Sequence, residues 1–368
     1  MTGTATTDAK TPDAETSGAA ASDAETSDAA ASDAAAAEPG VTGPPRGRGP
    51  LGGWRQLCET RPVVAGSLLT ACSALSYSAA NVALRQVSRP GDFGWSVWVT
   101  ANKAVVAFTA AFAICAVRSL RRGGGFPPWT LVPSLLLAGV LTQFVGNLSF
   151  QYALALGGLA LTVPLTFSTL IITGAVGGRV VLGEPVPRQT LAAMGVMIAA
   201  VIVLSQAAST ASADRTGTAA TTAMAVAAGC LAGFGYGGVG VVIRRARKAK
   251  LSVAASLVLI SGTGVVGMTT AATLVNGPGV FLRTTTAEYA WMQAASLFNA
   301  LAFFAVAAAY GLMPVTRVNL INVSQAALGG IAGVRFFAEP LTAYLIFGTL
   351  LTIGGLVVTT LERAADTP

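Results

Sequence analysis

Two basic residues lie inside long apolar stretches of this sequence. Lys103 lies about nine residues into one stretch, and Arg317 lies about four residues from the start of another. If these stretches cross a membrane, each charge costs at least about 2.5 kcal/mol unless it faces water or protein. Arg317 is near enough to an end to snorkel to the surface instead. Two cations without a mid-span carboxylate favour a solute that carries a carboxylate or a phosphate.

Uncharged polar side chains recur at helical spacing in several of the same stretches. Scattered Thr and Ser residues are typical of contacts between helices, each worth about 0.6 kcal/mol. Amide stripes beside a lysine instead favour a wet cavity. The stripes are Ser73, Tyr77 and Asn81; Trp98 and Asn102; Gln143, Asn147 and Gln151; Thr162, Thr166, Thr169 and Thr173; and Asn319, Asn322 and Gln325.

Several kinds of chemistry are excluded by the residue types. The sequence has no histidine, which removes histidine-based triads, common zinc motifs and histidine proton relays. Its four cysteines are scattered without metal-ligand spacing. No paired carboxylates occur at membrane depth. We therefore expect no enzymatic activity, no metal and no cofactor.

The composition is that of a membrane protein. Hydrophobic residues make up 53% of the 368 residues and charged residues only 11%, against about 25% charged residues in soluble domains. Ten apolar runs are each long enough to cross about 30 Å of hydrocarbon as a helix. They span roughly 63–84, 95–117, 130–152, 159–182, 189–207, 222–243, 251–275, 290–312, 314–337 and 341–361.

The remaining charges predict the orientation. Residues 1–50 form an acidic, low-complexity segment with a near-duplicated decamer, 15–24 against 25–34, and we expect it to be a disordered cytoplasmic tail. Basic residues near span ends are retained in the cytoplasm. Of the 23 Lys and Arg, fifteen lie in segments on the same side as the N-terminus and five on the other. Both termini are therefore predicted to be cytoplasmic, in a multi-pass protein of the inner (plasma) membrane. The basic residues lie between apolar runs, so we expect no nucleic-acid partner.

The sequence also repeats itself. Four positions recur at an offset of 155 residues, and the tetrapeptide at 76–79 resembles that at 235–238 at an offset of 159. Five spans per copy is an odd number, so the second copy must be inverted in the membrane. We predict a repeat over 62–207, a linker over 208–221 and a second repeat over 222–362. The recurring positions are Gly174, Gly178, Glu184 and Pro185, matched by Gly329, Gly333, Glu339 and Pro340.

Glycines inside the sixth run admit two interpretations. Gly233, Gly235 and Gly238 fit a dinucleotide-binding pattern, but that pattern needs a preceding strand. Glycines four residues apart, at 229, 233 and 237, instead predict a smooth face on which another helix packs closely. We favour the second interpretation.

These features resemble the drug/metabolite transporter superfamily in its EamA-type form, over roughly residues 62–362. The resemblance rests on the glycine-rich fourth and ninth spans, which end in Gly183-Glu184-Pro185 and Ala338-Glu339-Pro340. The sequence departs from the family pattern at Thr169 and Ser324, where a proline is usual. The resemblance implies an all-α protein of ten transmembrane helices in two inverted five-helix repeats, and transport by alternating access. It implies a site lined by Asn147, Thr166, Thr169, Asn299, Asn322 and Gln325.

We therefore expect a secondary transporter for a small organic solute that is anionic or amino-acid-like. The expected partners are that solute and the lipid bilayer. Formation of a homodimer is a further possibility that the sequence leaves undecided. The rival hypothesis is a membrane-embedded binding or assembly subunit, in which the polar stripes only hold helices together. Lys103, Arg317, Tyr77, Asn81, Trp98 and Asn102 complete the set of candidate site residues.

Overall fold

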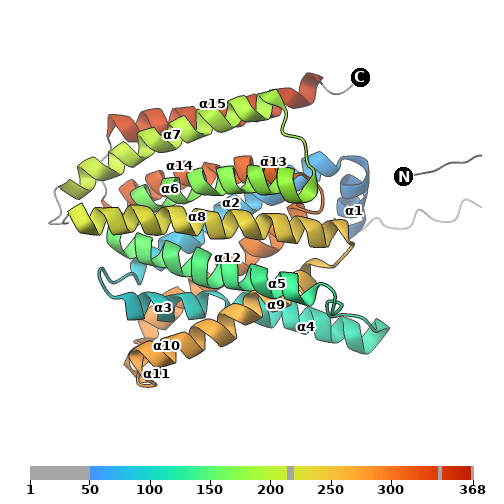
Figure 1. Ribbon diagram of the computed structural model, residues 1–368, viewed down its shortest axis with the longest axis horizontal. Helices are drawn as coiled ribbons and strands as arrows, with labels where there is room; N and C mark the ends of the chain where they lie inside the picture. Colours follow the sequence, from blue (N-terminus) through green and yellow to red (C-terminus); the bar gives the residue numbers. More distant parts are fainter. Residues whose placement is uncertain (1–49, 214–218, 339–341, 366–368) are drawn as a thin grey trace, which may run out of the picture. The chain divides into compact units, whose positions relative to one another are not determined.

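The computed structural model describes residues 50–213, 219–338 and 342–365. In these ranges every regular element is helical (Figure 1). The predicted tail lies outside the described residues, except that a first short helix already begins at Pro50. The elements are α1 (Pro50–Thr60), α2 (Pro62–Gln86), α3 (Phe93–Lys103), α4 (Val105–Arg122), α5 (Val132–Val140), the π-helix η1 (Leu141–Asn147), α6 (Leu148–Leu182), α7 (Arg188–Ala213), α8 (Ala219–Lys248), α9 (Val253–Thr263), the π-helix η2 (Gly264–Met268), α10 (Thr269–Asn276), α11 (Val280–Arg283), α12 (Thr286–Ala309), α13 (Val315–Asn322), α14 (Ser324–Phe337) and α15 (Ala343–Ala365).

Eight helical stretches among the described residues are long and apolar enough to cross a membrane. They agree with the prediction of a polytopic membrane protein. Two further apolar segments, Leu191–Ala200 in α7 and Ile346–Gly355 in α15, are shorter than a span. The eight are Pro62–Gln86, Phe93–Arg121, Val132–Ala160, Thr162–Leu182, Ala223–Lys248, Val253–Asn276, Thr286–Ala309 and Val315–Phe337.

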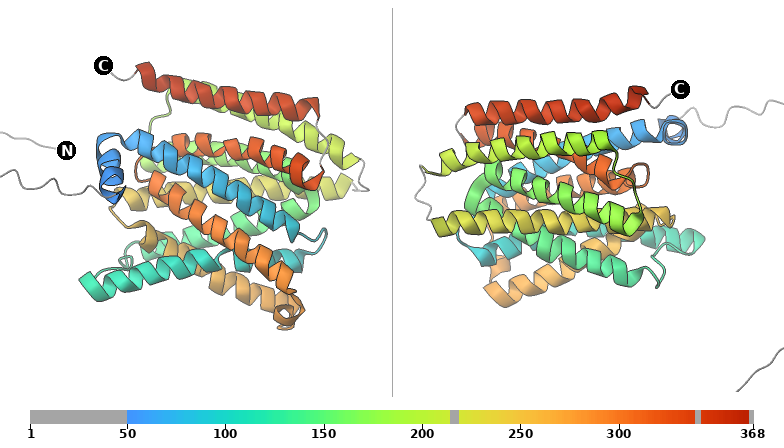
Figure 2. Two further views of the ribbon diagram at one scale, coloured as in Figure 1. Left: turned by 180° about the vertical axis from the view of Figure 1, so that it is seen from behind. Right: turned by 45° about the horizontal axis from the view of Figure 1, so that its top comes forward.

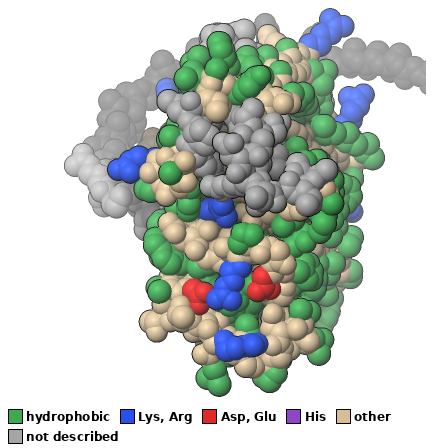
Figure 3. Space-filling view, turned by 90° about the vertical axis from the view of Figure 1, so that its left-hand side faces the viewer, with side chains coloured by type: hydrophobic (Ala, Val, Ile, Leu, Met, Phe, Trp, Pro, Cys, Tyr) green, Lys and Arg blue, Asp and Glu red, His purple; other side chains and the backbone are tan. Residues whose placement is uncertain are grey.

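Large apolar side chains cover much of the outer surface. Leu75, Val176 and Phe347 are 61%, 58% and 62% exposed. A water-soluble protein rarely exposes so many such residues together, whereas hydrocarbon solvates them well. Viewed along the helices, charged side chains gather on the end face and hydrophobic ones on the visible flanks (Figure 3). This distribution is typical of a membrane-embedded bundle.

The long helices run between two ends of the bundle. We call the end at which α1 lies the α1 end, and the opposite one the α11 end (Figure 1). Helix α12 lies along α2 (Figure 2), α8 packs against α6, and α7 pairs with α15. Helix α7 continues to Ala213 and α8 begins at Ala219. All described residues of the predicted linker 208–221 are therefore helical.

Close packing of α8 on α6 depends on glycine. A Cβ added at Gly233 would lie 2.7 Å from the Cβ of Thr169 and closer still to the backbone oxygen of Thr166. A Cβ at Gly237 would lie 2.6 Å from the Cβ of Thr173. The predicted smooth glycine face is confirmed, since the two backbones approach too closely for any side chain there.

Several helices are interrupted near the middle of the bundle. α3 and α4 are separated at Ala104, α13 and α14 at Val323, and the π-helices η1 and η2 interrupt two more spans. Gly158 differs from these, because its φ of 72°, a conformation that favours glycine, marks the turn inside α6 between the spans Val132–Ala160 and Thr162–Leu182. Breaks inside a span free backbone groups, and at membrane depth these must be satisfied by protein or by a water-filled cavity. The interruptions therefore point to the middle of the bundle as the place to look for a site.

Candidate functional site: a central polar cavity

A cavity of about 100 Å³ lies where the interrupted helices meet. Its walls come from α2, α3, η1, α6, α8, α9, α12, α13 and α14, so both predicted repeats contribute. Its polar lining residues are Tyr77, Asn81, Lys103, Thr142, Gln143, Asn147, Thr166, Tyr236, Ser261, Asn299, Tyr310, Asn319, Asn322 and Gln325.

Eight of the twelve candidate residues from the sequence line this cavity. They come from seven different helical elements, so helical spacing alone did not bring them together. Most are almost inaccessible, with Lys103 5% and Asn147 6% exposed. The eight are Tyr77, Asn81, Lys103, Asn147, Thr166, Asn299, Asn322 and Gln325.

Lys103 is held at the break between α3 and α4. Its backbone oxygen accepts hydrogen bonds from the Ser296 hydroxyl at 3.1 Å and the Asn299 amide at 3.4 Å. The Ser296 hydroxyl also accepts from the backbone N–H of Val106 at 3.1 Å. Polar groups freed by the break are therefore satisfied by α12, and the lysine backbone is fixed by the second half of the chain.

The Lys103 ammonium faces the cavity. Nζ donates to Oδ1 of Asn147 at 2.7 Å and lies 5.5 and 5.9 Å from the ring centres of Phe150 and Tyr236. An ammonium has three donors, and within the described residues this is its one hydrogen bond. No carboxylate occurs among the described lining residues. Two donors and an uncompensated positive charge are therefore left for a partner inside the cavity.

Asn147 is itself fixed by a chain of amides on η1. Its Oδ1 also accepts from the Tyr236 hydroxyl at 2.7 Å, and its Nδ2 donates to Oε1 of Gln143 at 2.8 Å. Gln143 in turn donates to the backbone oxygen of Ile260 at 3.3 Å. The amide that positions Lys103 is thus tied to α8 and α9.

Toward the α1 end, the cavity lining holds a second polar group. The Tyr310 hydroxyl donates to Oδ1 of Asn319 at 2.9 Å. Two buried polar atoms of the lining, Oγ of Ser261 and Nδ2 of Asn319, have no hydrogen-bond partner among the described residues. Buried polar groups are rarely left unpaired. Both atoms are themselves buried, so water or a solute can bond them only after the lining shifts.

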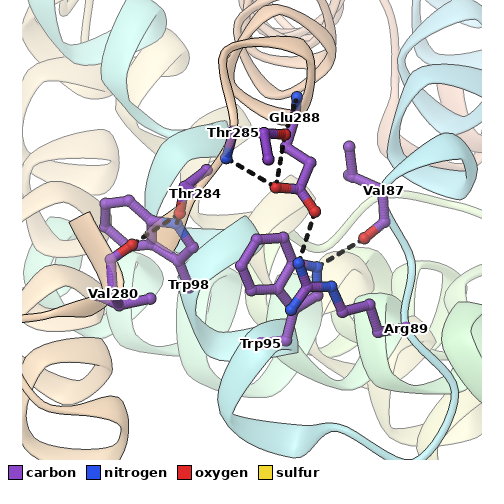
Figure 4. Close-up of polar contacts among 8 residues, drawn as sticks. All are labelled: Val87, Arg89, Trp95, Trp98, Val280, Thr284, Thr285 and Glu288. Atoms are coloured by element: carbon purple, nitrogen blue, oxygen red, sulfur yellow. Dashed lines mark hydrogen bonds and ion pairs between the residues drawn. The ribbon is translucent and has the colours of Figure 1, made fainter. Parts of the chain in front are cut away.

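Trp98 and Asn102 do not line the cavity. Nε1 of Trp98 donates to the Thr284 hydroxyl at 2.9 Å (Figure 4). The Trp98 ring packs edge-on against Phe281 of α11. Asn102 donates to the Trp98 backbone oxygen at 3.0 Å and accepts from Gln293 at 3.3 Å. Both side chains instead connect α3 to its neighbours.

Thr169 and Arg317 are also absent from the lining. The Thr169 hydroxyl donates back to the Leu165 oxygen at 3.3 Å, and its Cβ faces Gly233 of α8. Arg317 lies in the first turn of α13 and is half-buried. Helical spacing predicts which residues share a helix face, such as Thr169 with Thr166, but not how each helix is rotated about its axis toward the cavity.

Several lining residues were not among the candidates. Gln143 and Asn319 belong to the predicted stripes, whereas Tyr236, Tyr310 and Ser261 were not singled out. Tyr236 could have been found from the repeat, because it occupies the position equivalent to Tyr77 at an offset of 159. Tyr310 and Ser261 have no comparable signal in the sequence.

Comparisons with known proteins show the fold alone. No family model matches the chain, and no curated protein matches it. Twenty-eight chains of solved structures match it. One, described only as "Crystal structure of protein", has a TM-score of 0.59 and 16% identity, and the match covers 83% of this chain and 99% of that one. The same arrangement of helices therefore occurs in another protein.

Proposed function

We propose that this protein is a secondary transporter that moves a small organic solute bearing an acidic group, by alternating access around the central cavity. The observation that carries this proposal is the buried ammonium of Lys103, which has two free donors in the central cavity. A charge at membrane depth is costly and typically marks a solute pathway. A carboxylate or phosphate of the solute would compensate it.

The proposal includes ten spans in two inverted repeats, with α7 and α15 as the fifth and tenth. Two capping contacts at an offset of 155 support it: the N–H of Gly183 bonds the oxygen of Gly178, and the N–H of Ala338 bonds that of Gly333. Both capping residues are left-handed, although Ala338 is not glycine. Tyr77 and Tyr236, at equivalent positions, both line the cavity. Inverted repeats around a midplane site are the usual architecture of alternating access.

The resemblance to EamA-type transporters supports the same function. With the N-terminus inside, the α1 end is the cytoplasmic one and the basic last turn of α8 marks it. The site residues implied by that resemblance include Asn147, Asn299 and Gln325, which share the cavity with Lys103.

Purified protein in liposomes provides the test. Labelled monocarboxylates, sugar phosphates, amino acids and cationic drugs are offered to the wild type and to Lys103→Gln. We expect uptake of at least one anionic solute by the wild type and its loss in Lys103→Gln. Arg335→Gln, at an exposed position at the end of α14, is the matched control and should transport normally. If no solute moves faster through the wild type than through Lys103→Gln, the transporter is rejected.

The rival function is a membrane-embedded binding or assembly subunit. It predicts dense packing where the polar stripes meet. The cavity, with unpartnered atoms on Ser261 and Asn319, favours the transporter instead. Saturable binding of a solute that never crosses the liposome membrane would favour the rival.

A further inference from the structure

Four helices meet around one carboxylate at the α1 end. Glu184, just beyond α6, accepts from Nε of Arg244 at 2.8 Å and lies 3.2 Å from Nζ of Lys248, both on α8. Its other oxygen accepts from the backbone N–H of Val315, at the start of α13, at 3.2 Å. Arg244 also donates to the backbone oxygen of Tyr310, directly after α12, at 2.6 Å. We call these five residues the Glu184 cluster.

The Glu184–Arg244 ion pair of the cluster is shielded from solvent, whereas the Lys248 side chain is 45% exposed. The side chains of Glu184 and Arg244 are 9% and 15% exposed. Burial alone would raise the pKa of the Glu184 carboxyl, but the hydrogen bonds from Arg244, Val315 and Lys248 outweigh it and lower that pKa below its ordinary value. The carboxylate is therefore charged at neutral pH and bonded on both oxygens. By contrast, the Arg89–Glu288 ion pair at the α11 end is 47% and 22% exposed (Figure 4).

The cluster adjoins the cavity directly. Tyr310, whose backbone oxygen is held by Arg244, presents its hydroxyl to the cavity and bonds Asn319 there. Ile243, the residue before Arg244, also lines the cavity. The bonds of the cluster therefore hold the helices together just beyond the α1-facing part of the lining.

These bonds join elements that must separate if the cavity is to open at this end. Glu184 ties the end of α6 to the start of α13, and Arg244 ties α8 to the end of α12. The first tie crosses from one predicted repeat to the other. Charge-assisted hydrogen bonds are stronger than neutral ones and depend on geometry, so a shift of α6 or α8 breaks them. Water can replace them once the end is open.

We propose that the Glu184 cluster is the gate that closes the central cavity at its α1 end. This inference rests on the proposed function, since a gate implies a pathway. The gate is broken and remade once in each transport cycle, and its carboxylate and guanidinium stay charged throughout. The position of Tyr310, which both lines the cavity and is held by Arg244, couples a bound solute to the state of the gate.

Cysteine accessibility tests the gate without reference to any solute. A reporter cysteine replaces Val306, a cavity-lining residue that is 5% exposed. Cys58, Cys72, Cys115 and Cys230 are first replaced by Ala. Vesicles of each orientation are treated with a charged, membrane-impermeant thiol reagent. Glu184→Gln and Arg244→Gln should each raise the labelling rate several-fold from the α1 side and leave it unchanged from the other side.

The matched control is Glu288→Gln, which removes the ion pair at the α11 end and should leave labelling from the α1 side unchanged. Size-exclusion profiles and thermal stability in detergent identify variants that fold. The double variant Glu184→Gln, Arg244→Gln should be labelled from the α1 side at nearly the same rate as each single variant, because both substitutions remove the same contact. If folded Glu184→Gln and Arg244→Gln proteins are labelled at the wild-type rate, the gate proposal is rejected and the proposed transport function is unaffected. Raised labelling in a protein that moves no solute would uphold a mobile closure and reject the transporter.

Discussion

At the scale of single residues, the site depends on how one amide holds one lysine. Asn147 receives hydrogen bonds from both Lys103 and Tyr236 on the same oxygen. A carbonyl oxygen with two donors has a fixed direction, and it keeps the ammonium beside the rings of Phe150 and Tyr236. Precise placement of the charge is what allows a site to select a solute by the position of its acidic group.

Replacing Asn147 by the similarly shaped leucine should therefore weaken solute binding. A hydrogen bond to a charged group contributes about 1.5–3 kcal/mol, so we expect KM for the transported solute to rise about 10-fold or more. The maximal rate should change less than KM, because the charge itself remains. Gln151→Leu is the control, since this buried amide bonds Ser88 and does not line the cavity. An unchanged KM in Asn147→Leu would contradict the positioning role.

Site residues could be predicted from the sequence where the polar residues of one helix share a face, and could not where they lie on different faces. Trp98 and Asn102 share one helix face, but Lys103 follows Asn102 by one residue and so points about 100° away. Only one of the two faces can line the cavity, and the structure places Lys103 there. Tyr310 could not be predicted, because its place depends on how α12 meets α13. The eight apolar spans, by contrast, follow from composition and length alone.

At the scale of helices, glycines set the distances between neighbours. Gly233 allows the backbones of α8 and α6 to approach at the same level as Thr166, which lines the cavity. The Thr166 hydroxyl donates across this contact to the oxygen of Gly229 at 3.2 Å. The width of the cavity on this side is thus set by a contact between two backbones.

Gly233→Ala should lower the thermal stability of the purified protein. The added methyl overlaps the backbone of α6, and overpacking typically costs about 1–3 kcal/mol. Gly195→Ala is the control, because a Cβ at Gly195 has open space around it. The two melting temperatures in detergent should therefore differ, with Gly233→Ala lower. Equal melting temperatures would show that the two helices can move apart freely.

The contacts of Glu184 between helices also predict a pH dependence. Its pKa is lowered in the folded protein from an ordinary value of 4.5. The contribution of the cluster to stability is therefore complete above about pH 4.5 and is lost as pH falls through the lowered pKa. Melting curves between pH 3 and 7 should show wild type and Glu184→Gln converging in acid and diverging near neutrality. If the melting temperatures of wild type and Glu184→Gln differ by the same amount at every pH in this range, the stabilising role of the Glu184 carboxylate is contradicted.

At the scale of the whole molecule, the number of crossings decides the architecture. If α7 crosses the membrane, α4 and α8 end on the same side. If α7 does not cross, they end on opposite sides. The pairing of α7 with α15 makes these two helices a unit that crosses together or not at all.

Cysteines at Arg121 and Ala249, exposed at the ends of α4 and α8, should react with an impermeant reagent from one side of the membrane. A cysteine at Leu282, 91% exposed on α11, should react from the other side. This result is expected for ten spans with both termini inside. Labelling of Arg121→Cys and Ala249→Cys from opposite sides would leave eight spans and would remove the inverted repeat.

The buried ammonium of Lys103 has one further consequence, which concerns voltage. A charge that changes its depth in the membrane field gains or loses about 2.3 kcal/mol per 100 mV for a full crossing. Among the described lining residues Lys103 is the one cation, so in the proposed transport cycle an empty cavity would move a net positive charge when its access changes. An anionic solute cancels that charge. Membrane potential should therefore act on the return of the empty carrier and have little effect on the loaded one.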